Sequence, residues 1–214
     1  MQTFGNAVIL CGGKSRRMGF DKSLLKLANQ PVVAATARKL DQLFDTVRLS
    51  AYEPTDKFNA FGRQVLYDTY TGHLGPLVAI HSALAHATSQ YVFVIAVDMP
   101  CVNVAHVLAM QAPIQKHPWE AVIPRHQGFT ESLYGYYSRE ALPVIEKCID
   151  KGVYKVQRAL DQLDTLYLPE AESVRFDPTL GMFTNLNRPE DLLKVTTYQD
   201  EEIQPYGSST NKAH

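Results

Sequence analysis

An uninterrupted apolar run in the middle of the chain, Tyr-Val-Phe-Val-Ile-Ala-Val at residues 91–97, sets the strongest limit on the fold. Successive side chains of a strand point to opposite faces of the sheet, so a run without polar residues must be covered on both sides. Such cover is typical of parallel sheets, in which helices pack against the two faces. The run therefore predicts a central strand of an α/β sheet.

Strand-like and helix-like segments alternate over the first 110 residues, as expected for a parallel sheet whose strands are joined by right-handed crossovers. We predict strands at 7–10, 46–51, 64–67 and 91–97, and helices at 31–40, 76–87 and 103–110. The alternation then loosens, and we predict strands at 121–124, 133–137 and 166–168, and helices at 140–149, 155–163 and 189–195. The predicted fold class is α/β, with a single Rossmann-like three-layer domain and a mostly parallel central sheet.

Length and composition limit the class of protein further. The 214 residues, 45% of them hydrophobic, fit one sizeable domain at 1–197, followed by a polar tail at 198–214 that we expect to be disordered. The net charge of −1 argues against nucleic-acid binding. No signal peptide is recognisable, and no apolar run approaches the roughly 20 residues of a membrane span. Three cysteines without a Cys-x-x-Cys pair fit a cytoplasmic protein.

The strand predicted at 7–10 leads directly into a basic, glycine-rich loop, Cys-Gly-Gly-Lys-Ser-Arg-Arg-Met-Gly-Phe-Asp-Lys at 11–22. Gly12 and Gly13 permit backbone conformations that a Cβ forbids, so successive N–H groups can converge on an anion. Four positive charges within nine residues suit a triphosphate better than a solvated turn, which is the alternative interpretation. These charges belong to Lys14, Arg16, Arg17 and Lys22.

Two common phosphate-binding motifs do not match this loop. A P-loop ending at Gly13-Lys14-Ser15 requires glycine at position 8, where Val8 stands. The dinucleotide fingerprint requires glycine at position 14, where Lys14 stands. The segment therefore indicates a different kind of nucleotide loop.

Two acidic residues directly follow predicted strands, Asp68 after 64–67 and Asp98 after 91–97. Ligands of open parallel sheets bind outside the carboxyl ends of the strands, so Asp98 should face the same crevice as the basic loop. A hard carboxylate oxygen there suits Mg²⁺. Asp68 can accept the adjacent donors of a guanine edge. The alternative is that each residue only forms a turn.

Two asparagines near the C-terminal end form a further candidate site. Asn187 precedes the helix predicted to begin at Pro189 and is well placed to cap it. A functional interpretation adds a contact with a second substrate, with Asn185 beside it. We expect Tyr134, Tyr136 and Tyr137 to pack the sheet rather than to stack on a ligand. The adjacent polar residues that can contact an anionic cosubstrate are Arg125, His126 and Gln127.

The basic loop resembles the signature Gly-Gly-x-x-x-Arg-Met-Gly-x-Asp-Lys of the molybdenum cofactor guanylyltransferase family, which matches Gly12 to Lys22 without a gap. The resemblance continues at Gly75-Pro76-Leu77, where Ala79 replaces a second glycine of the family pattern. It also includes the strand end at Asp98 and the segment Asn-Leu-Asn-Arg-Pro-Glu-Asp-Leu at 185–192. Together these matches span residues 6 to about 195.

The resemblance implies a nucleotidyltransferase domain at 1–197 that transfers GMP from GTP to molybdopterin and releases pyrophosphate. It implies that Lys22, Arg17 and Asp98 are catalytic, that Asp98 holds Mg²⁺, and that Asn185 and Asn187 bind the second substrate. The implied nucleotide-binding residues are Leu10, Cys11, Gly12, Gly13, Lys22, Ser50, Asp68 and Asp98. Protein partners that deliver or accept the cofactor are possible, whereas nucleic acid and membrane are not expected partners.

One position departs from the family. Ser50 stands at the end of the second strand, where the family tends to have an asparagine that contacts the nucleotide, and serine lacks the second donor of the amide. The departure leaves a cytidylyltransferase acting on the same pterin as the nearest alternative. A nucleotidyltransferase for a sugar phosphate and a regulatory nucleotide-binding module without turnover are more distant ones.

Overall fold

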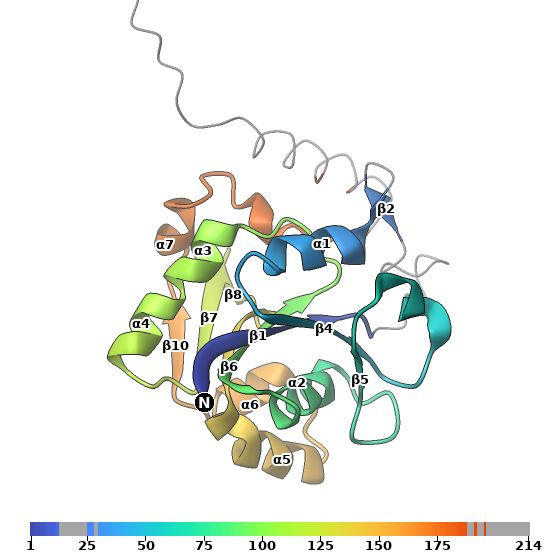
Figure 1. Ribbon diagram of the computed structural model, residues 1–214. Coiled ribbons are helices and arrows are strands. Elements are labelled where there is room, and N and C mark those ends of the chain that lie inside the picture. Colours follow the sequence, from blue (N-terminus) through green and yellow to red (C-terminus); the bar gives the residue numbers. More distant parts are fainter. Residues whose placement is uncertain (13–24, 28–29, 188–190, 192–194, 196–214) are drawn as a thin grey trace, which may run out of the picture.

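The computed structural model spans residues 1–214 and describes all of them except 13–24, 28–29, 188–190, 192–194 and 196–214 (Figure 1). The predicted tail at 198–214 and most of the helix predicted at 189–195 lie outside the described residues. So do Gly13, Arg17 and Lys22 of the basic loop.

A mostly parallel sheet runs through the described part of the chain, with the strand order β10-β7-β9-β6-β1-β4-β5 and a short β8 beside β7. β1 pairs in parallel with β4 and β6, β4 with β5, and β10 with β7, whereas β9 is antiparallel to β6 and β7. The strands are β1 Gln2–Leu10, β4 Thr46–Ala51, β5 Val65–Tyr67, β6 Ser89–Ala96, β7 Ala121–His126, β8 Phe129–Thr130, β9 Tyr134–Ser138 and β10 Thr165–Leu168. A small hairpin, β2 Lys26–Leu27 and β3 Gln30–Pro31, stands apart from the sheet.

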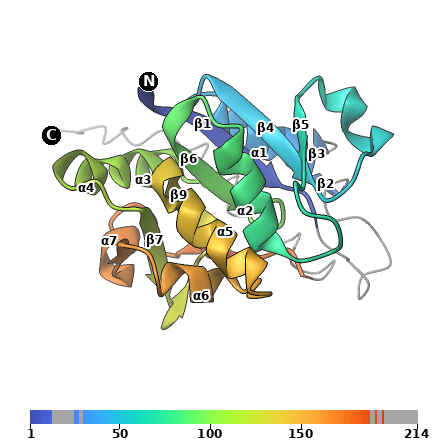
Figure 2. The same ribbon diagram turned by 90° about the horizontal axis from the view of Figure 1, so that it is seen from below.

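Helices cover both faces of the sheet, so the predicted three-layer α/β fold with a mostly parallel sheet is confirmed (Figure 1). We call the two faces the α1 side and the α2 side. The α1 side carries α1 Val32–Leu40, α3 Val104–Ala109, α4 Gln111–Lys116 and α7 Glu170–Val174. The α2 side carries α2 Pro76–Ala85, α5 Leu142–Asp150 and α6 Val156–Leu160, and Figure 2 shows α2 and α5 side by side. Short 3₁₀ helices complete the described elements, at Asp56–Phe61, Arg139–Ala141 and Gly181–Phe183.

The strand with the apolar run is the central one, as predicted. β6 stands fourth of the seven strands in the main path of the sheet. Phe93 and Ile95 pack into the core on the α1 side, and Val92 and Val94 into the core on the α2 side. Within the described ranges, the structure contains no helix that is both long and apolar enough to cross a bilayer.

Helix boundaries follow the local chemistry of the sequence. α2 begins at Pro76, directly after Gly75, whose φ of 100° is accessible to glycine at little cost. α3 begins after Asn103, whose side chain accepts a hydrogen bond from the His106 backbone N–H at 2.9 Å. The sequence therefore marks the starts of α2 and α3.

Several predicted elements need correction. The helix expected at 155–163 is limited to α6, because the chain turns after Leu160 to enter β10. The helix expected at 140–149 begins as a 3₁₀ turn, and α5 starts only at Leu142. Our prediction missed α4, which accommodates Pro113 because the first turn of a helix needs no hydrogen bond from its N–H groups. It also missed α7.

The three tyrosines of β9 pack inside the molecule, as expected. Tyr134 and Tyr136 belong to the core on the α1 side, and Tyr137 to the core on the α2 side. Burial raises the pKa of Tyr136 and of Tyr137 well above its usual range, so neither phenol carries a charge. Gly135, between Tyr134 and Tyr136, pairs with Val94 of β6, and β9 also pairs with β7.

We predict that Gly135→Ala destabilises the protein. A Cβ at this position would lie 2.5 Å from Ile123 Cδ1 and 2.7 Å from the Val122 carbonyl oxygen, so the sheet would have to shift. The free energy of unfolding in urea should fall by about 1–3 kcal/mol. Gly5→Ala is the control, because a Cβ there meets only the flexible end of Gln2. Equal stability of the two variants would contradict the packing argument.

Candidate active site

Four parallel strands bring their carboxyl ends to one edge of the sheet. Leu10, the last residue of β1, pairs with Ser50 of β4 on one side and with Ala96 of β6 on the other. Asp68 follows β5 directly, and Asp98 follows the end of β6 by two residues. The structure thus places these predicted site residues at the same edge of the sheet.

The start of the basic loop is fastened to both neighbouring strands. The Cys11 N–H donates to the Ser50 carbonyl oxygen at 2.9 Å, and the Val97 N–H donates to the Leu10 carbonyl oxygen at 3.1 Å. Cys11 is buried, and its thiol contacts the Ile9 carbonyl oxygen at 3.5 Å, as expected of a small apolar substitute. Gly12 is exposed. The described part of the loop therefore begins at a strand end that is hydrogen-bonded on both sides and becomes exposed at Gly12.

Ser50 and Asp68 face the same side of the sheet. Leu49 and Ala51 pack on the α1 side, so Ser50 between them faces the α2 side. Leu66 pairs with Ser50 and packs on the α2 side, and Asp68 stands two residues further along the same strand direction. The two residues predicted to bind the nucleotide thus lie on the face of the sheet that α2 covers.

Asp68 is the electrostatically unusual residue of this edge. Its N–H donates to the Ala51 carbonyl oxygen at 3.2 Å, which fixes the backbone. Its Oδ1 atom is buried and finds no hydrogen-bond donor among the described residues. Burial raises the pKa of the Asp68 carboxyl to about 6. An acceptor held in this way is well suited to N–H donors supplied by a ligand.

Asp98 lies beside a segment from far along the chain. The Leu186 N–H donates to the Asp98 carbonyl oxygen at 2.7 Å, so the residues on either side of Leu186 reach the same edge. Asn185 is partly buried and donates from its amide to the Phe183 carbonyl oxygen at 3.3 Å. Asn187 is exposed, and its N–H donates to a carboxylate oxygen of Asp191 at 3.0 Å. Both predicted substrate-binding asparagines are therefore sequence neighbours of the residue that is bonded to Asp98.

The far side of this edge contains acidic residues that the sequence analysis did not single out. Glu170 of α7 binds the tip of the β7–β8 hairpin, at 3.0 Å from His126 Nδ1 and 2.6 Å from the Gln127 N–H. Glu131 is partly buried, and burial raises the pKa of its carboxyl while nearby His126 opposes the shift. Arg125 stacks over Tyr167 instead of standing free. No local sequence motif announces these contacts, because they join distant segments.

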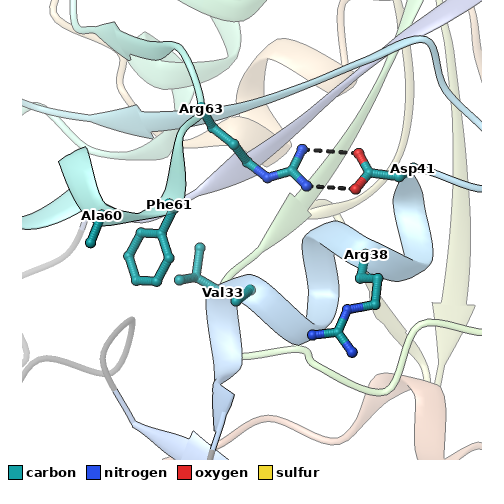
Figure 3. A pocket seen from close by; sticks show the side chains of 7 residues that line it. Val33, Arg38, Asp41, Ala60, Phe61 and Arg63 are labelled. Atoms are coloured by element: carbon teal, nitrogen blue, oxygen red, sulfur yellow. Dashed lines mark hydrogen bonds and ion pairs between the residues drawn. The ribbon is translucent and has the colours of Figure 1, made fainter.

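A separate pocket of about 330 Å³ lies between α1 and the 3₁₀ helix Asp56–Phe61 (Figure 3). Arg63 pairs with Asp41 through both of its terminal nitrogens and closes one end. Asp41 precedes β4 and Arg63 precedes β5, so this end lies near the amino ends of the strands. That end of the pocket therefore lies away from the edge that carries Asp68 and Asp98, whereas Val33 and Ala34 line the pocket at the beginning of α1. Its lining consists of Val33, Ala34, Arg38, Asp41, Ala60, Phe61 and Arg63.

Comparison with known families decides the relationship of this chain. Residues 7–165 match the family described as "MobA-like NTP transferase domain". The chain belongs to the MobA-like NTP transferase family. The family that the resemblance indicated is thus confirmed, as is the expectation of a nucleotidyltransferase.

Named relatives of this MobA-like chain extend over most of its length. The molybdenum cofactor guanylyltransferase of Syntrophotalea carbinolica is 36% identical over 191 residues, which cover 89% of this chain and 90% of that protein. The probable molybdenum cofactor guanylyltransferase of Peptoclostridium acidaminophilum is 32% identical over 204 residues, or 93% of this chain and 91% of that protein.

Solved structures support the same relationship. Molybdopterin-guanine dinucleotide biosynthesis protein A from Archaeoglobus fulgidus is similar with a TM-score of 0.80 and 26% identity, covering 92% of this chain and 99% of that chain. The 2-C-methyl-D-erythritol 4-phosphate cytidylyltransferase from Thermus thermophilus has a TM-score of 0.63 and 14% identity, with 92% of this chain and 98% of that chain covered. The latter likeness shows a shared fold alone.

We predict that Asp68→Asn stabilises this MobA-like chain at neutral pH. Because burial raises the pKa of the carboxyl from 3.8 to about 6, the folded state holds a proton more readily than the unfolded chain between these values. The free energy of unfolding therefore falls as pH rises through that range. Removing the charge should stabilise the protein at about pH 7.5 by on the order of 1 kcal/mol, since partial exposure screens the effect.

Urea unfolding of the variant and the wild type at about pH 7.5 and about pH 4 provides the test. The difference between the two proteins should shrink at the lower pH, where the carboxyl of the wild type is mostly protonated. A variant that is less stable than the wild type at neutral pH would show that Asp68 has a partner within the protein.

Proposed function

We propose that this protein transfers GMP from GTP to molybdopterin and releases pyrophosphate, which yields a guanine dinucleotide form of the cofactor. The observation that carries the proposal is the meeting of Asp68, Asp98 and the start of the basic loop at one edge of the sheet. The names of the curated relatives support the same reaction.

The base-recognition part of the proposal rests on Asp68. Guanine presents a ring N–H and an amino group side by side, and one carboxylate can accept from both. The buried Oδ1 of Asp68 has no donor among the described residues, so such a base would supply the missing hydrogen bond. Ser50, on the same face, contributes a hydroxyl. GTP is therefore the nucleotide that this side of the edge fits best.

The phosphate-binding part of the proposal rests on the basic loop. Because the Cys11 N–H is bonded to the Ser50 carbonyl oxygen, the backbone N–H groups that would face the phosphates begin at Gly12, and the sequence continues with Gly13. Lys22 and Arg17 belong to the matched signature and would offset the charge of the triphosphate. These last three residues lie outside the described part, so their roles follow from the sequence match.

Asp98 would hold a magnesium ion. Its carboxylate is partly buried at the carboxyl edge, beside the segment that carries Asn185. No group of three or more His, Cys, Asp or Glu side chains among the described residues could hold a metal ion unaided. Mg²⁺ usually combines one or two carboxylates with phosphate oxygens and water, so the donor set fits. Such an ion would neutralise charge that develops on the phosphates.

The chemistry requires alignment more than proton transfer. An oxygen of the terminal phosphate of molybdopterin would form a bond to the α-phosphorus of GTP, while the bond from that phosphorus to the pyrophosphate oxygen breaks. The attacking oxygen is already anionic, so no general base is needed. Asn185 and Asn187 would bind and orient the acceptor, and Lys22 and Arg17 would stabilise the charge on the departing pyrophosphate.

We predict that Asp98→Asn lowers turnover with saturating GTP and molybdopterin by on the order of 10²–10³. The amide keeps the shape of the side chain and removes the charge that holds the ion. The measurement is the rate of pyrophosphate release as a function of Mg²⁺ concentration. Asp164→Asn is the matched control, because Asp164 is exposed and pairs with His117 near the amino end of β10. Wild-type rates and Mg²⁺ dependence in Asp98→Asn would reject the assignment.

We predict that the wild type prefers GTP over CTP by at least roughly tenfold in kcat/KM, and that Asp68→Ala removes most of this preference. Cytosine lacks the paired donors and would leave the carboxylate unsatisfied. Competition between the two nucleotides in one reaction measures the ratio. Equal use of CTP by the wild type would favour a cytidylyltransferase, in keeping with Ser50 in the place of asparagine. An unchanged ratio in the variant would place base recognition elsewhere.

A further inference from the structure

The residue that follows Asp68 is fastened to two helices behind the sheet by a chain of polar contacts. The Thr69 N–H donates to Ser82 Oγ at 3.0 Å, and Thr69 Oγ1 lies 2.9 Å from His81 Nδ1. His81 Nε2 in turn lies 3.1 Å from a carboxylate oxygen of Glu146 on α5. We call Thr69, His81, Ser82 and Glu146 the loop anchor.

Donors and acceptors within the loop anchor can all be matched. Ser82 Oγ donates to the Val78 carbonyl oxygen at 3.0 Å, which leaves it free to accept the Thr69 N–H. Both ring nitrogens of His81 have partners, and its side chain is only 8% exposed. Tyr70 covers the imidazole edge-on, at 5.2 Å between ring centroids. His81 and Ser82 are buried, whereas Thr69 and Glu146 are exposed, so the anchor has a buried centre on α2 and reaches the surface at both ends.

The anchor fixes the backbone on one side of Asp68, and β4 fixes it on the other. The Asp68 N–H donates to the Ala51 carbonyl oxygen at 3.2 Å, and the next N–H, that of Thr69, reaches Ser82. The chain then leaves regular structure until Pro76, with positive φ values at Gly72 and Gly75. Without the anchor, a flexible loop would begin at the residue after Asp68.

The polar side-chain atoms of the loop anchor have hydrogen-bond partners, whereas the buried Oδ1 of Asp68 has none among the described residues. Thr69 is hydrogen-bonded to both His81 and Ser82. The anchor thus holds the backbone while it leaves the carboxylate to a ligand. Supporting side chains that are hydrogen-bonded to one another are expected beside a group that they orient towards a substrate.

We propose that Thr69 and His81 are positioning residues for base selection, which act by holding Asp68 in the orientation that accepts the donors of guanine. This inference rests on the proposed function, because it assumes that Asp68 contacts the base. The inference adds two residues that do not contact the substrate to the groups that determine the preference for guanine. It attributes part of this preference to the hydrogen bonds that connect the loop after Asp68 with α2 and α5.

Thr69→Val provides the sharpest test, because valine keeps the shape of threonine and removes the hydroxyl that contacts His81 and Ser82. The dissociation constant of GTP, measured by calorimetry on the full-length protein, should rise about three- to tenfold, the effect of losing one or two hydrogen bonds. The ratio of CTP to GTP dissociation constants should fall by a similar factor. Thr69→Ser restores the hydroxyl and should restore both values.

His81→Phe tests the second positioning residue, since it keeps an aromatic ring and removes both nitrogens. We expect the same loss of GTP affinity and selectivity, with kcat at saturating GTP and molybdopterin within about twofold of the wild type. His117→Phe is the matched control, because His117 also pairs with a carboxylate, that of Asp164, near the amino end of β10. It should leave affinity, selectivity and kcat unchanged.

The outcomes separate this inference from the function on which it rests. If Asp68→Ala loses its preference for GTP while Thr69→Val and His81→Phe keep theirs, the inference is wrong and the function stands. A lower melting temperature of these variants with an unchanged ratio of CTP to GTP dissociation constants would show that the anchor only stabilises the fold, and would also contradict the inference. If wild-type protein neither binds GTP nor turns it over with molybdopterin, the proposed function fails first.

Discussion

The parallel pairing of β1 with β4 and β6 is the constraint on which the site depends. Because Leu10 pairs with both Ser50 and Ala96, three strands end in register, and their following residues emerge at one edge. The pairing persists because both faces of these strands are covered by apolar cores. A slip by one residue would turn Ser50 and Leu10 from the α2 side to the α1 side.

Asn6 and Asn103 are buried polar residues that, unlike Asp68, find their hydrogen-bond partners within the fold. Asn6 is buried in β1, and its side-chain oxygen accepts hydrogen bonds from the N–H groups of Thr88 and Ser89, at 2.7 and 3.3 Å. Asn103 caps α3 and also donates to the Phe176 carbonyl oxygen. These residues stabilise the fold, whereas the unsatisfied carboxylate of Asp68 costs stability. That cost is what a site prepared for a ligand is expected to show.

Much of the fold could be predicted because its signals are local. The apolar run at 91–97 identified the central strand, and Gly75 with Pro76 marked the start of α2. Positions directly after strands, such as Asp68 and Asp98, could be assigned to one edge because parallel strands share their direction. The ends of α6 and the presence of α4 and α7 depend on packing partners and turn geometry, so composition alone did not reveal them.

The candidate site shows the same limit. The basic loop was evident from its glycines and charges, but the hydrogen bond from Leu186 to Asp98 joins segments that no local pattern connects. The loop anchor was missed for the same reason, because it joins Thr69 to His81 and Ser82 of α2 and to Glu146 of α5. A lone histidine on an apolar helix predicts packing, and only the tertiary structure shows that it reaches the loop after Asp68.

Transfer of the α-phosphate tests the central claim most directly. Full-length protein would be incubated with Mg²⁺, molybdopterin and GTP labelled at the α-phosphorus. Our account predicts that label enters a guanine dinucleotide of molybdopterin, with one pyrophosphate released for each labelled product and none released when molybdopterin is omitted. Pyrophosphate release that does not depend on molybdopterin, or label that remains entirely in GTP and GMP, would contradict it.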